Sequence, residues 1–380
     1  MQDLGARVKA ASAVLANITT AEKDEALKTA ADCLVAATPE ILEANCADIE
    51  RAQTAGTPDT VIDRLRLDTS RVDAMGEGLR QLVALTDPIG KTVEQWTRPN
   101  GLEIQKIRVP LGVVAIIYEN RPNVTSDAFG LCLKSGNAAF LRGSSAAIDS
   151  NIAIARALRE GITKAGLPED ALMLVTDTSH AAAIEFMQLR DHIDCLIPRG
   201  GPSLINSILD NAKVPYVIDG DGNCHIYVDE AADLDLATKV IVNAKMQRPS
   251  VCNAAESLVL HSQIAPSFLP RITDALKGVE LVGDKRAQDL VPSIQPATEQ
   301  DWSTEYLDLK MSVRIVDNID EAIHHININS TGHSEAIISS NQTATKEFVR
   351  RVDAAAVLVN TSTRFVDGEE FGFGAEIGIS

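Results

Sequence analysis

A regular alternation of short β-rich runs and helical segments constrains the fold of this chain more than any other feature of its sequence. In the first half of the chain the β-rich runs lie at residues 112–118, 138–142, 171–176, 194–199 and 215–219. Strands that alternate with helices of about ten or more residues form right-handed crossovers and a parallel sheet covered on both faces. We therefore expect a doubly wound α/β domain of the kind that binds nucleotide cofactors.

The same alternation continues in the second half of the chain. The β-rich runs there lie at residues 224–229, 256–261, 279–283, 311–317, 335–340 and 356–360. No Pro- or Ser-rich linker separates the two series, and no repeat period is evident. The 380 residues exceed a typical domain, which has roughly 150. The sequence thus predicts two doubly wound α/β domains.

The stretch before residue 112 has a different pattern. It begins with helical segments, and Thr19 followed by Glu22 three positions later resembles a capping box at a helix start. Two extended runs follow on either side of Pro99-Asn100-Gly101, whose glycine suits a turn that needs a positive φ. We expect a projecting β-hairpin within residues 94–110.

Charge and cysteine content exclude several classes of function. The 35 Lys and Arg residues against 53 Asp and Glu residues give a formal net charge of −18, which repels nucleic acid and anionic lipid alike. The N-terminus has no apolar run of signal-peptide or membrane length. The six cysteines form no C-x-x-C pair and the histidines are scattered, so we expect a reducing, cytoplasmic compartment and no metal site.

Cys252 is the first candidate for chemistry because of its surroundings in KMQRPSVCNAAESLVLH. It lies just after Pro249, between a helical segment and a β-rich run, and Lys245 and Arg248 precede it. A helix that starts near Ser250 would direct backbone N–H groups at the thiol, and with the two cations it would favour the nucleophilic thiolate. From these residues alone, a buried and unreactive cysteine remains the alternative.

Two polar loops follow neighbouring predicted strands in IYENRPNVTSDAFGLCLKSGNAAFLRGSS. Asn120, after the first strand, can donate an amide N–H to an oxyanion, which contributes on the order of 3–4 kcal/mol to a tetrahedral transition state. A turn-stabilising asparagine is the alternative. Arg142 and Ser144, after the second strand, offer a guanidinium and a hydroxyl, and this combination suits the adenosine 2′-phosphate of NADP.

A third loop, IPRGGPSLI, places Arg199, Gly200 and Gly201 between a predicted strand and a helix. The first turn of that helix can hold a pyrophosphate, although a plain strand-to-helix turn is the alternative. The G-x-G-x-x-G fingerprint of the standard dinucleotide fold does not occur in the chain. The sequence therefore predicts a nucleotide site that differs from the standard Rossmann pyrophosphate loop.

Several of these segments, with two more, resemble the aldehyde dehydrogenase superfamily, and within it the reductases that act on L-glutamyl 5-phosphate. The segments are IYENRPN, KSGNAAFLRGSS, IPRGGPSLI, DGNCHIYVD, KMQRPSVCNAAESLVLH and NTSTRFVDGEEFGFGAEIGIS. The resemblance implies an aldehyde dehydrogenase-like fold, with an NADP-binding domain over residues 1–223 and a catalytic domain over residues 224–363. It makes residues 94–110 a small oligomerisation hairpin and residues 364–380 a C-terminal return segment, beyond which chains of the family carry a further tail.

The resemblance also implies roles for individual residues. Cys252 matches the nucleophile, and Asn120 matches the asparagine that binds the oxyanion together with the Cys252 amide. The residues that match the cofactor-binding positions are Arg142 and Ser144 for the adenosine ribose, Arg199, Gly200 and Gly201 beside the pyrophosphate, and Glu305 at the nicotinamide ribose.

The implied reaction is the NADPH-dependent reduction of L-glutamyl 5-phosphate to L-glutamate 5-semialdehyde through a Cys252 thioester, the second step of proline biosynthesis from glutamate. Hydrolytic aldehyde dehydrogenases keep a glutamate in the glycine-rich turn that here reads VIDGDGNC, and no glutamate stands there. The alternatives are nevertheless a hydrolytic aldehyde dehydrogenase and an inactive structural member of the fold. A homo-oligomer, either a dimer or a tetramer, and a glutamate kinase are the expected protein partners, and no nucleic acid or membrane is expected.

Overall fold

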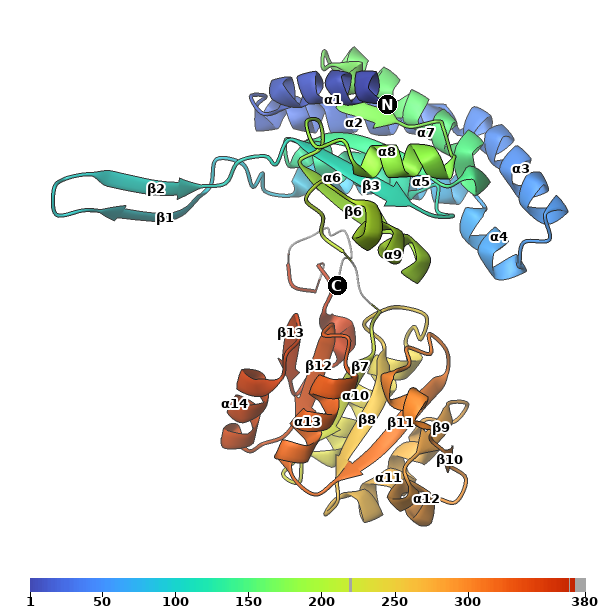
Figure 1. The fold of residues 1–380 in the computed structure, drawn as a ribbon, viewed down its shortest axis with the longest axis vertical. Helices are drawn as coiled ribbons and strands as arrows, with labels where there is room; N and C mark the ends of the chain where they lie inside the picture. Colours follow the sequence, from blue (N-terminus) through green and yellow to red (C-terminus); the bar gives the residue numbers. More distant parts are fainter. Residues whose placement is uncertain (219–220, 369, 373–380) are drawn as a thin grey trace. The chain divides into compact units, whose positions relative to one another are not determined.

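The computed structural model describes residues 1–218, 221–368 and 370–372, apart from the side chains of Thr60 and Pro202. The chain divides at residues 219–220 into two compact units, which we call unit 1 and unit 2 (Figure 1). The sequence placed this boundary slightly later, between residues 223 and 224. Residues 364–368 and 370–372, predicted as a separate segment, belong to unit 2.

Unit 1 begins with a layer of helices. They are α1 (Gln2–Leu15), α2 (Thr20–Ala36), α3 (Thr38–Thr54), α4 (Asp59–Leu65) and α5 (Thr69–Ala84). The predicted capping box is confirmed at the start of α2, where the Glu22 amide donates to Thr19 Oγ1 at 3.3 Å and the Thr19 amide donates to Glu22 Oε2 at 2.7 Å. The buried face of α2 then packs against α5 and the sheet-covering helices.

The predicted hairpin follows, formed by β1 (Thr92–Thr97) and β2 (Glu103–Ile107). The strands are antiparallel, with Trp96 opposite Ile104, and Gly101 takes a φ of +86° in the connecting turn. In Figure 1 the hairpin extends away from the other elements of unit 1. Every residue of β1 is exposed, so within this chain the hairpin buries neither of its faces.

The sheet of unit 1 has the strand order β5-β4-β3-β6, and all its pairs are parallel. Its strands are β3 (Val113–Tyr118), β4 (Ala138–Gly143), β5 (Leu172–Leu174) and β6 (Cys195–Arg199), and its helices are α6 (Val124–Lys134), α7 (Ile148–Lys164), α8 (His180–Met187) and α9 (Pro202–Asn211). All residues of β3 and β4 are buried, as expected for strands covered on both faces. The predicted doubly wound arrangement is confirmed.

One predicted strand of unit 1 is largely absent. Of this run, the described residues 215–218 contribute only an isolated bridge, which pairs Tyr216 with Leu196 of β6, and residue 219 lies outside the described residues. Tyr216 and Val217 are both exposed. This segment therefore lies at the open edge of the sheet, where few neighbours favour a regular strand.

Unit 2 contains a second parallel sheet, of seven strands in the order β10-β9-β11-β8-β7-β12-β13 among its described residues. The strands are β7 (Cys224–Val228), β8 (Ala255–His261), β9 (Glu280–Gly283), β10 (Gln295–Pro296), β11 (Lys310–Val316), β12 (Ser334–Ile338) and β13 (Ala356–Val359). The helices are α10 (Leu234–Met246), α11 (Ala265–Ala275), α12 (Lys285–Leu290), α13 (Ile319–Asn329) and α14 (Gln342–Arg351). Short 3₁₀ turns are η1 (Ser145–Ala147) and η2 (Glu169–Ala171) in unit 1, and η3 (Glu299–Ser303) and η4 (Thr363–Phe365) in unit 2.

Alternate residues of these strands enter two separate apolar clusters. Ile226 and Leu258 pack with helices α10 and α11 on one face, whereas Tyr227 and Val259 pack with α13 and α14 on the other. This period of two is the property of a central strand buried on both sides. In the described part of the chain, no helix is long and apolar enough to span a bilayer.

Candidate active site

The register of the unit 1 sheet brings three predicted loops to one edge. Tyr118, the last residue of β3, pairs with Gly143 of β4 on one side and with Arg199 of β6 on the other. The loops that begin at residues 119, 144 and 200 therefore leave the carboxyl ends of three adjacent strands. Ligands of open α/β sheets bind at this edge.

Asn120 and Ser144 meet directly at this edge. Asn120 Oδ1 accepts the hydroxyl of Ser144 at 3.2 Å, and the Asn120 amide lies 3.4 Å from the same hydroxyl oxygen. Asn120 takes a φ of +43°, a left-handed conformation that asparagine adopts more readily than most residues. Because its oxygen is engaged, its side-chain nitrogen is the end left to donate to a ligand.

The Arg199-Gly200-Gly201 loop leads into α9, whose N-cap is Gly201. The Gly201 amide points to a carboxylate oxygen of Glu119 at 3.4 Å, and a Cβ built on Gly200 would lie 2.7 Å from the carboxyl carbon of Glu119. A carboxylate thus already lies at the start of this helix, where backbone N–H groups and the helix dipole favour negative charge.

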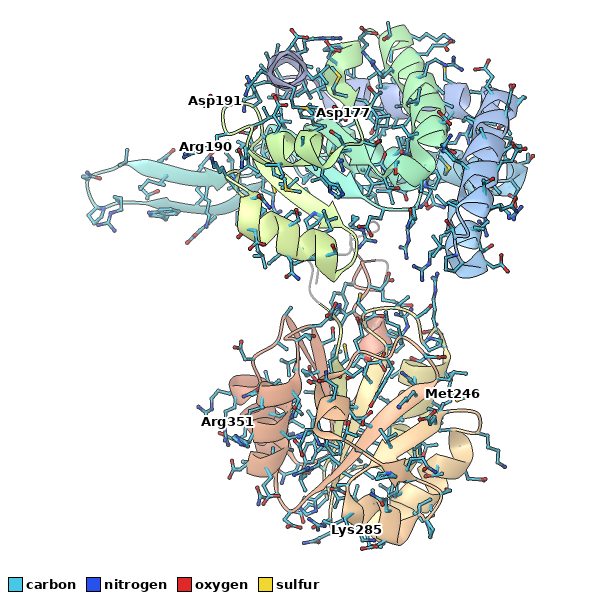
Figure 2. The ribbon with its side chains drawn as sticks, turned by 45° about the vertical axis from the view of Figure 1, so that its right-hand side comes forward. Asp177, Arg190, Asp191, Met246, Lys285 and Arg351 are labelled. Carbon is cyan, nitrogen blue, oxygen red and sulfur yellow. The ribbon has the colours of Figure 1, made fainter. Side chains whose placement is uncertain are left out.

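The sequence suggested that the Arg142 guanidinium is available to a ligand at the end of β4. In the structure this side chain does not extend freely. It is buried, and Nη2 donates to the carbonyl oxygens of Thr178 and Ser179, each at 2.9 Å. Burial lowers the pKa of Arg142, and Asp177 on the same loop opposes that shift. Arg142 therefore ties down the loop before α8, on which Figure 2 labels Asp177.

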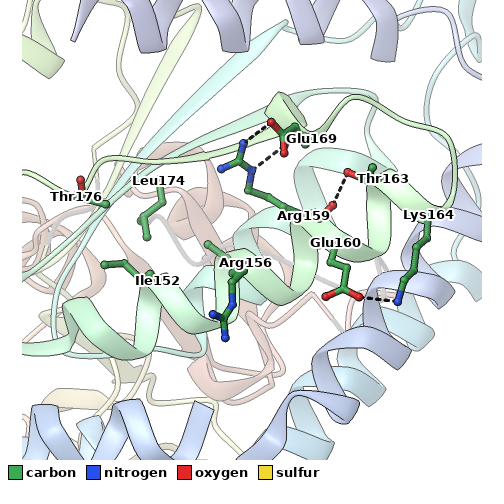
Figure 3. Close-up of a pocket in the computed structure, with 10 residues that line it drawn as sticks. Ile152, Arg156, Arg159, Glu160, Thr163, Lys164, Glu169, Leu174 and Thr176 are labelled. Atoms are coloured by element: carbon green, nitrogen blue, oxygen red, sulfur yellow. Dashed lines mark hydrogen bonds and ion pairs between the residues drawn. The ribbon is translucent and has the colours of Figure 1, made fainter. Parts of the chain in front are cut away.

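A surface cavity on unit 1 lies away from these loops. It measures about 570 Å³ and is lined by residues of α7 and the segment around β5, including Arg156, Arg159 and Thr176 (Figure 3). Several of its charged groups bind each other, as Arg159 does with Glu169. None of the predicted site residues lines this cavity, so we do not assign the cofactor to it.

In unit 2, Cys252 lies on a connection of turns between α10 and β8, and Figure 2 labels Met246, where α10 ends. The helix predicted to start near Ser250 is absent, and the prediction was wrong because the chain enters β8 after only a few residues. Lys245 was expected to favour the Cys252 thiolate. Its ammonium is instead bound to another group, because Nζ donates to Glu256 Oε2 at 2.6 Å in the interior. Hence neither a helix start nor Lys245 accounts for a reactive thiol.

The backbone of Cys252 is instead held by the start of β7. A Cβ built on Gly222 would lie 1.7 Å from the carbonyl oxygen of Cys252, so only glycine fits there. The Cys224 thiol donates to that same carbonyl oxygen at 3.2 Å. On the other side, the neighbouring Asn253 donates from Nδ2 to the Val366 carbonyl at 2.8 Å. The half-buried Cys252 is thus fixed through its backbone.

Glu305 reaches the same region through Gly222. Its Oε1 accepts the Gly222 amide at 2.8 Å, and Gly222 contacts the Cys252 backbone. Glu305 precedes β11 and lies close to the buried Lys245–Glu256 ion pair. The Leu307 amide, two residues after Glu305, donates to Glu256 Oε1 at 3.3 Å. The structure therefore brings Glu305 and Cys252 together within unit 2.

Burial raises the pKa of Glu256 to about 7, and the ammonium of Lys245 opposes this shift. Burial likewise lowers the pKa of Lys245. Both side chains are fully buried, so the pair is costly unless each group keeps its partner. Lys245 in VIVNAKM and Glu256 in AAESLVLH are single charges in apolar runs, and this signal could have revealed them.

Among the described residues, no group of three or more His, Cys, Asp or Glu side chains is arranged to hold a metal ion. The residues that sequence reasoning missed are Gly222, Cys224, Lys245 as an ion-pair partner, and Glu256. Gly222 acts through its close approach to the Cys252 backbone, and Cys224 acts through one hydrogen bond to the Cys252 carbonyl. Neither contact leaves a motif in the sequence.

Known proteins match almost the whole chain. The aldehyde dehydrogenase family model matches residues 3–308. Gamma-glutamyl phosphate reductase of Clostridium botulinum (strain Eklund 17B / Type B) is 54% identical over 378 residues, covering 99% of this chain and 91% of that protein. The enzyme of the same name from Syntrophomonas wolfei is 50% identical over 382 residues, covering 100% of this chain and 91% of its own.

A solved structure agrees with these sequence matches. The crystal structure of gamma-glutamyl phosphate reductase from Thermotoga maritima superposes with a TM-score of 0.97 at 48% identity, covering 100% of this chain and 92% of that chain. The predicted aldehyde dehydrogenase-like fold is confirmed by this match. The chain therefore belongs to the aldehyde dehydrogenase family and, within it, to the gamma-glutamyl phosphate reductases.

Proposed function

We propose that this chain reduces L-glutamyl 5-phosphate to L-glutamate 5-semialdehyde and phosphate, the second step of proline biosynthesis from glutamate. The observation that carries the proposal is the match of 54% identity over 99% of the chain to a relative of that name. The rigidly held Cys252 loop supports it, because an acyl transfer needs a nucleophile in a fixed position.

In the proposed reaction the Cys252 thiolate attacks the γ-carbonyl carbon of the acyl phosphate. The C–O bond to phosphate breaks, its electron pair leaves with the phosphate, and a thioester to Cys252 remains. A nicotinamide cofactor, when bound, would supply the hydride for reduction of this thioester. The oxyanion is stabilised by N–H donors, for which the Asn120 side-chain nitrogen and the Cys252 amide are the candidates. Collapse to the aldehyde returns the thiolate.

The hydrolytic alternative needs a base that activates water beside the thioester. In this chain, position 222, which touches the Cys252 backbone, has no room for the side chain of such a base. A thioester without such a base persists until it is reduced, as acyl phosphate reduction requires.

Oxidation of glutamate 5-semialdehyde with NADP is the direct test. We expect it to require inorganic phosphate, because phosphate is the acceptor that resolves the thioester in this direction. The rate without phosphate should fall to that of a no-enzyme control. Oxidation at an equal rate without phosphate would show that water resolves the thioester, and the reductase proposal would then fail.

We propose NADPH as the physiological cofactor, with Arg142, Ser144, the Arg199-Gly200-Gly201 loop and Glu305 holding it. The start of α9 supports this assignment, because backbone N–H groups and the helix dipole favour an anion there, as the bond from the Gly201 amide to Glu119 illustrates. Glu305 and Ser144 offer the oxygen groups that bind ribose hydroxyls.

Arg142→Ala should lower the ratio of kcat/KM with NADPH to kcat/KM with NADH by about tenfold or more, because a charge-assisted bond to the 2′-phosphate is lost. Steady-state kinetics with each cofactor measure that ratio. Arg142 also ties down residues 178 and 179. Were this its whole role, both efficiencies would drop in parallel and the ratio would stay constant, which would contradict the proposal.

We further propose that the β1–β2 hairpin joins copies of this chain into an oligomer. Val93, Trp96 and Ile107 expose large apolar side chains on it, and such surface favours association. Replacing Trp96 and Ile107 with serine should yield a smaller species in light scattering. Gln95→Ser, a polar change on the same strand, is the matched control. An unchanged mass would contradict this role for the hairpin.

A cytoplasmic location and a glutamate kinase partner complete the proposal. A kinase that forms the labile acyl phosphate is the enzyme class that must supply this substrate. Affinity capture from cell extract should retain a glutamate kinase when its own substrates are present. Failure to retain it under those conditions would remove this partner from the proposal.

A further inference from the structure

The η4 turn is fastened to the Cys252 loop at two points. Asn253, next to Cys252, donates from Nδ2 to the Val366 carbonyl at 2.8 Å, just after the turn. Arg364, within the turn, donates from Nε to Gln247 Oε1 at 3.3 Å, at the other end of the loop. These two hydrogen bonds connect the turn to both ends of the loop within unit 2.

The turn itself is well anchored. Ser362, its N-cap, accepts the Arg364 amide on its hydroxyl at 3.2 Å. Ser362 and Thr363 are both buried. The backbone that carries Arg364 is therefore anchored, while Arg364 as a whole is only half-buried.

Arg364 lies in the electrostatic field of the nucleophile and of a second cation. Burial lowers the pKa of Arg364, Asp367 opposes the shift, and Arg248 adds to it through like charge, with the Cys252 thiol as a further neighbour. The charged and ionisable neighbours of Arg364 are thus the Asp367 carboxylate, the Arg248 guanidinium and the Cys252 thiol. A negatively charged ligand would relieve this repulsion.

We propose that Arg364, with Arg248 beside it, forms the subsite that binds an oxyanion of the acyl phosphate substrate next to Cys252. This inference rests on the proposed function and adds the substrate contact that sequence reasoning left unassigned. A guanidinium binds carboxylate and phosphate alike through paired N–H donors. The bound group is therefore the departing phosphate or the α-carboxylate of the glutamyl moiety.

The oxidation direction separates these two sources, because phosphate and glutamate 5-semialdehyde are then independent substrates with independent KM values. Arg364→Met should raise one of the two KM values by about tenfold or more. A rise confined to phosphate assigns the subsite to the leaving group, and a rise confined to the semialdehyde assigns it to the α-carboxylate. Arg364→Lys should give a smaller rise, since lysine keeps the charge without the paired donors.

Arg350→Met is the matched control. Arg350 is an exposed arginine of the same unit that binds Glu347 on α14, and its replacement should change neither KM value. Arg248→Gln should raise the same KM value as Arg364→Met, to a smaller extent. Because Arg248 is exposed, this variant tests the subsite even if Arg364→Met does not fold.

Alkylation provides a readout independent of turnover. Phosphate or L-glutamate, whichever matches the affected KM, should slow the reaction of Cys252 with iodoacetamide in the wild type and not in Arg364→Met. If both KM values and this protection stay at wild-type levels in folded variants, the subsite is overturned. If the wild type itself lacks phosphate-dependent oxidation, the proposed function fails instead, so the two failures are distinguishable.

Discussion

Cys252→Ser should abolish the reduction of L-glutamyl 5-phosphate, with kcat falling by about 10⁴-fold or more, as expected when the group that forms the covalent intermediate is lost. Serine keeps the size of the side chain, and the contacts that hold this loop involve the backbone of residue 252 and its neighbours. The variant should therefore fold normally. Single-turnover assays with NADPH measure the rate of reduction, and thermal unfolding measures the stability of the variant.

Cys46→Ser is the control for this prediction. Cys46 is exposed in unit 1 and belongs to no part of the site, so its replacement should leave kcat and iodoacetamide inactivation at wild-type levels. A folded Cys252→Ser variant with appreciable reductase activity would show that the thiol is not the nucleophile, and the thioester route would have to be abandoned.

Lys245→Met should be the most destabilising single change proposed for unit 2. It leaves the fully buried Glu256 carboxylate without its cation, which costs about 3–5 kcal/mol in the free energy of unfolding. Lys239→Met, an exposed lysine on the same helix, should change that free energy little. Removing both charges with Lys245→Met and Glu256→Leu should recover much of the loss, because an apolar pair can replace a buried ion pair.

This destabilisation should also depend on pH in a defined direction. The pKa of Glu256 is about 7 in the folded chain against an ordinary value of 4.5, and loss of Lys245 raises it further because an opposing charge is gone. A carboxyl whose pKa is higher when folded contributes stability below its unfolded value, and this is lost as pH rises through the folded value. Urea unfolding should therefore show a larger loss at about pH 8 than at about pH 5. An equal loss at both pH values would contradict this account.

The architecture was predictable because it depends on local signals. The strand and helix runs, the capping box at Thr19 and the turn at Gly101 each follow from neighbouring residues. The strand expected at residues 215–219 is absent from the described residues 215–218, because its formation depends on an edge neighbour rather than on its own composition. Propensity alone does not report which edge of a sheet stays open.

The candidate site was less predictable because its contacts join distant parts of the chain. The sequence marked Cys252, yet it could not show that Lys245 binds Glu256, because nothing in either run specifies the distance between the two side chains. It also could not show that Arg142 turns toward residues 178 and 179. The direction in which a side chain points depends on tertiary packing, and a sequence pattern carries no information on that packing.

The close approach of Gly222 to Cys252 has a consequence for protein engineering. Since no atom can be added at residue 222 without displacing the Cys252 carbonyl, a substitution at this position would shift the backbone that carries the thiol. Libraries that aim at bulkier or uncharged acyl groups should leave residues 222 and 224 constant and vary the η4 turn instead. The residues most worth varying there are also those that we propose to recognise charge, so a wider substrate range should come at the expense of selectivity for anionic substrates.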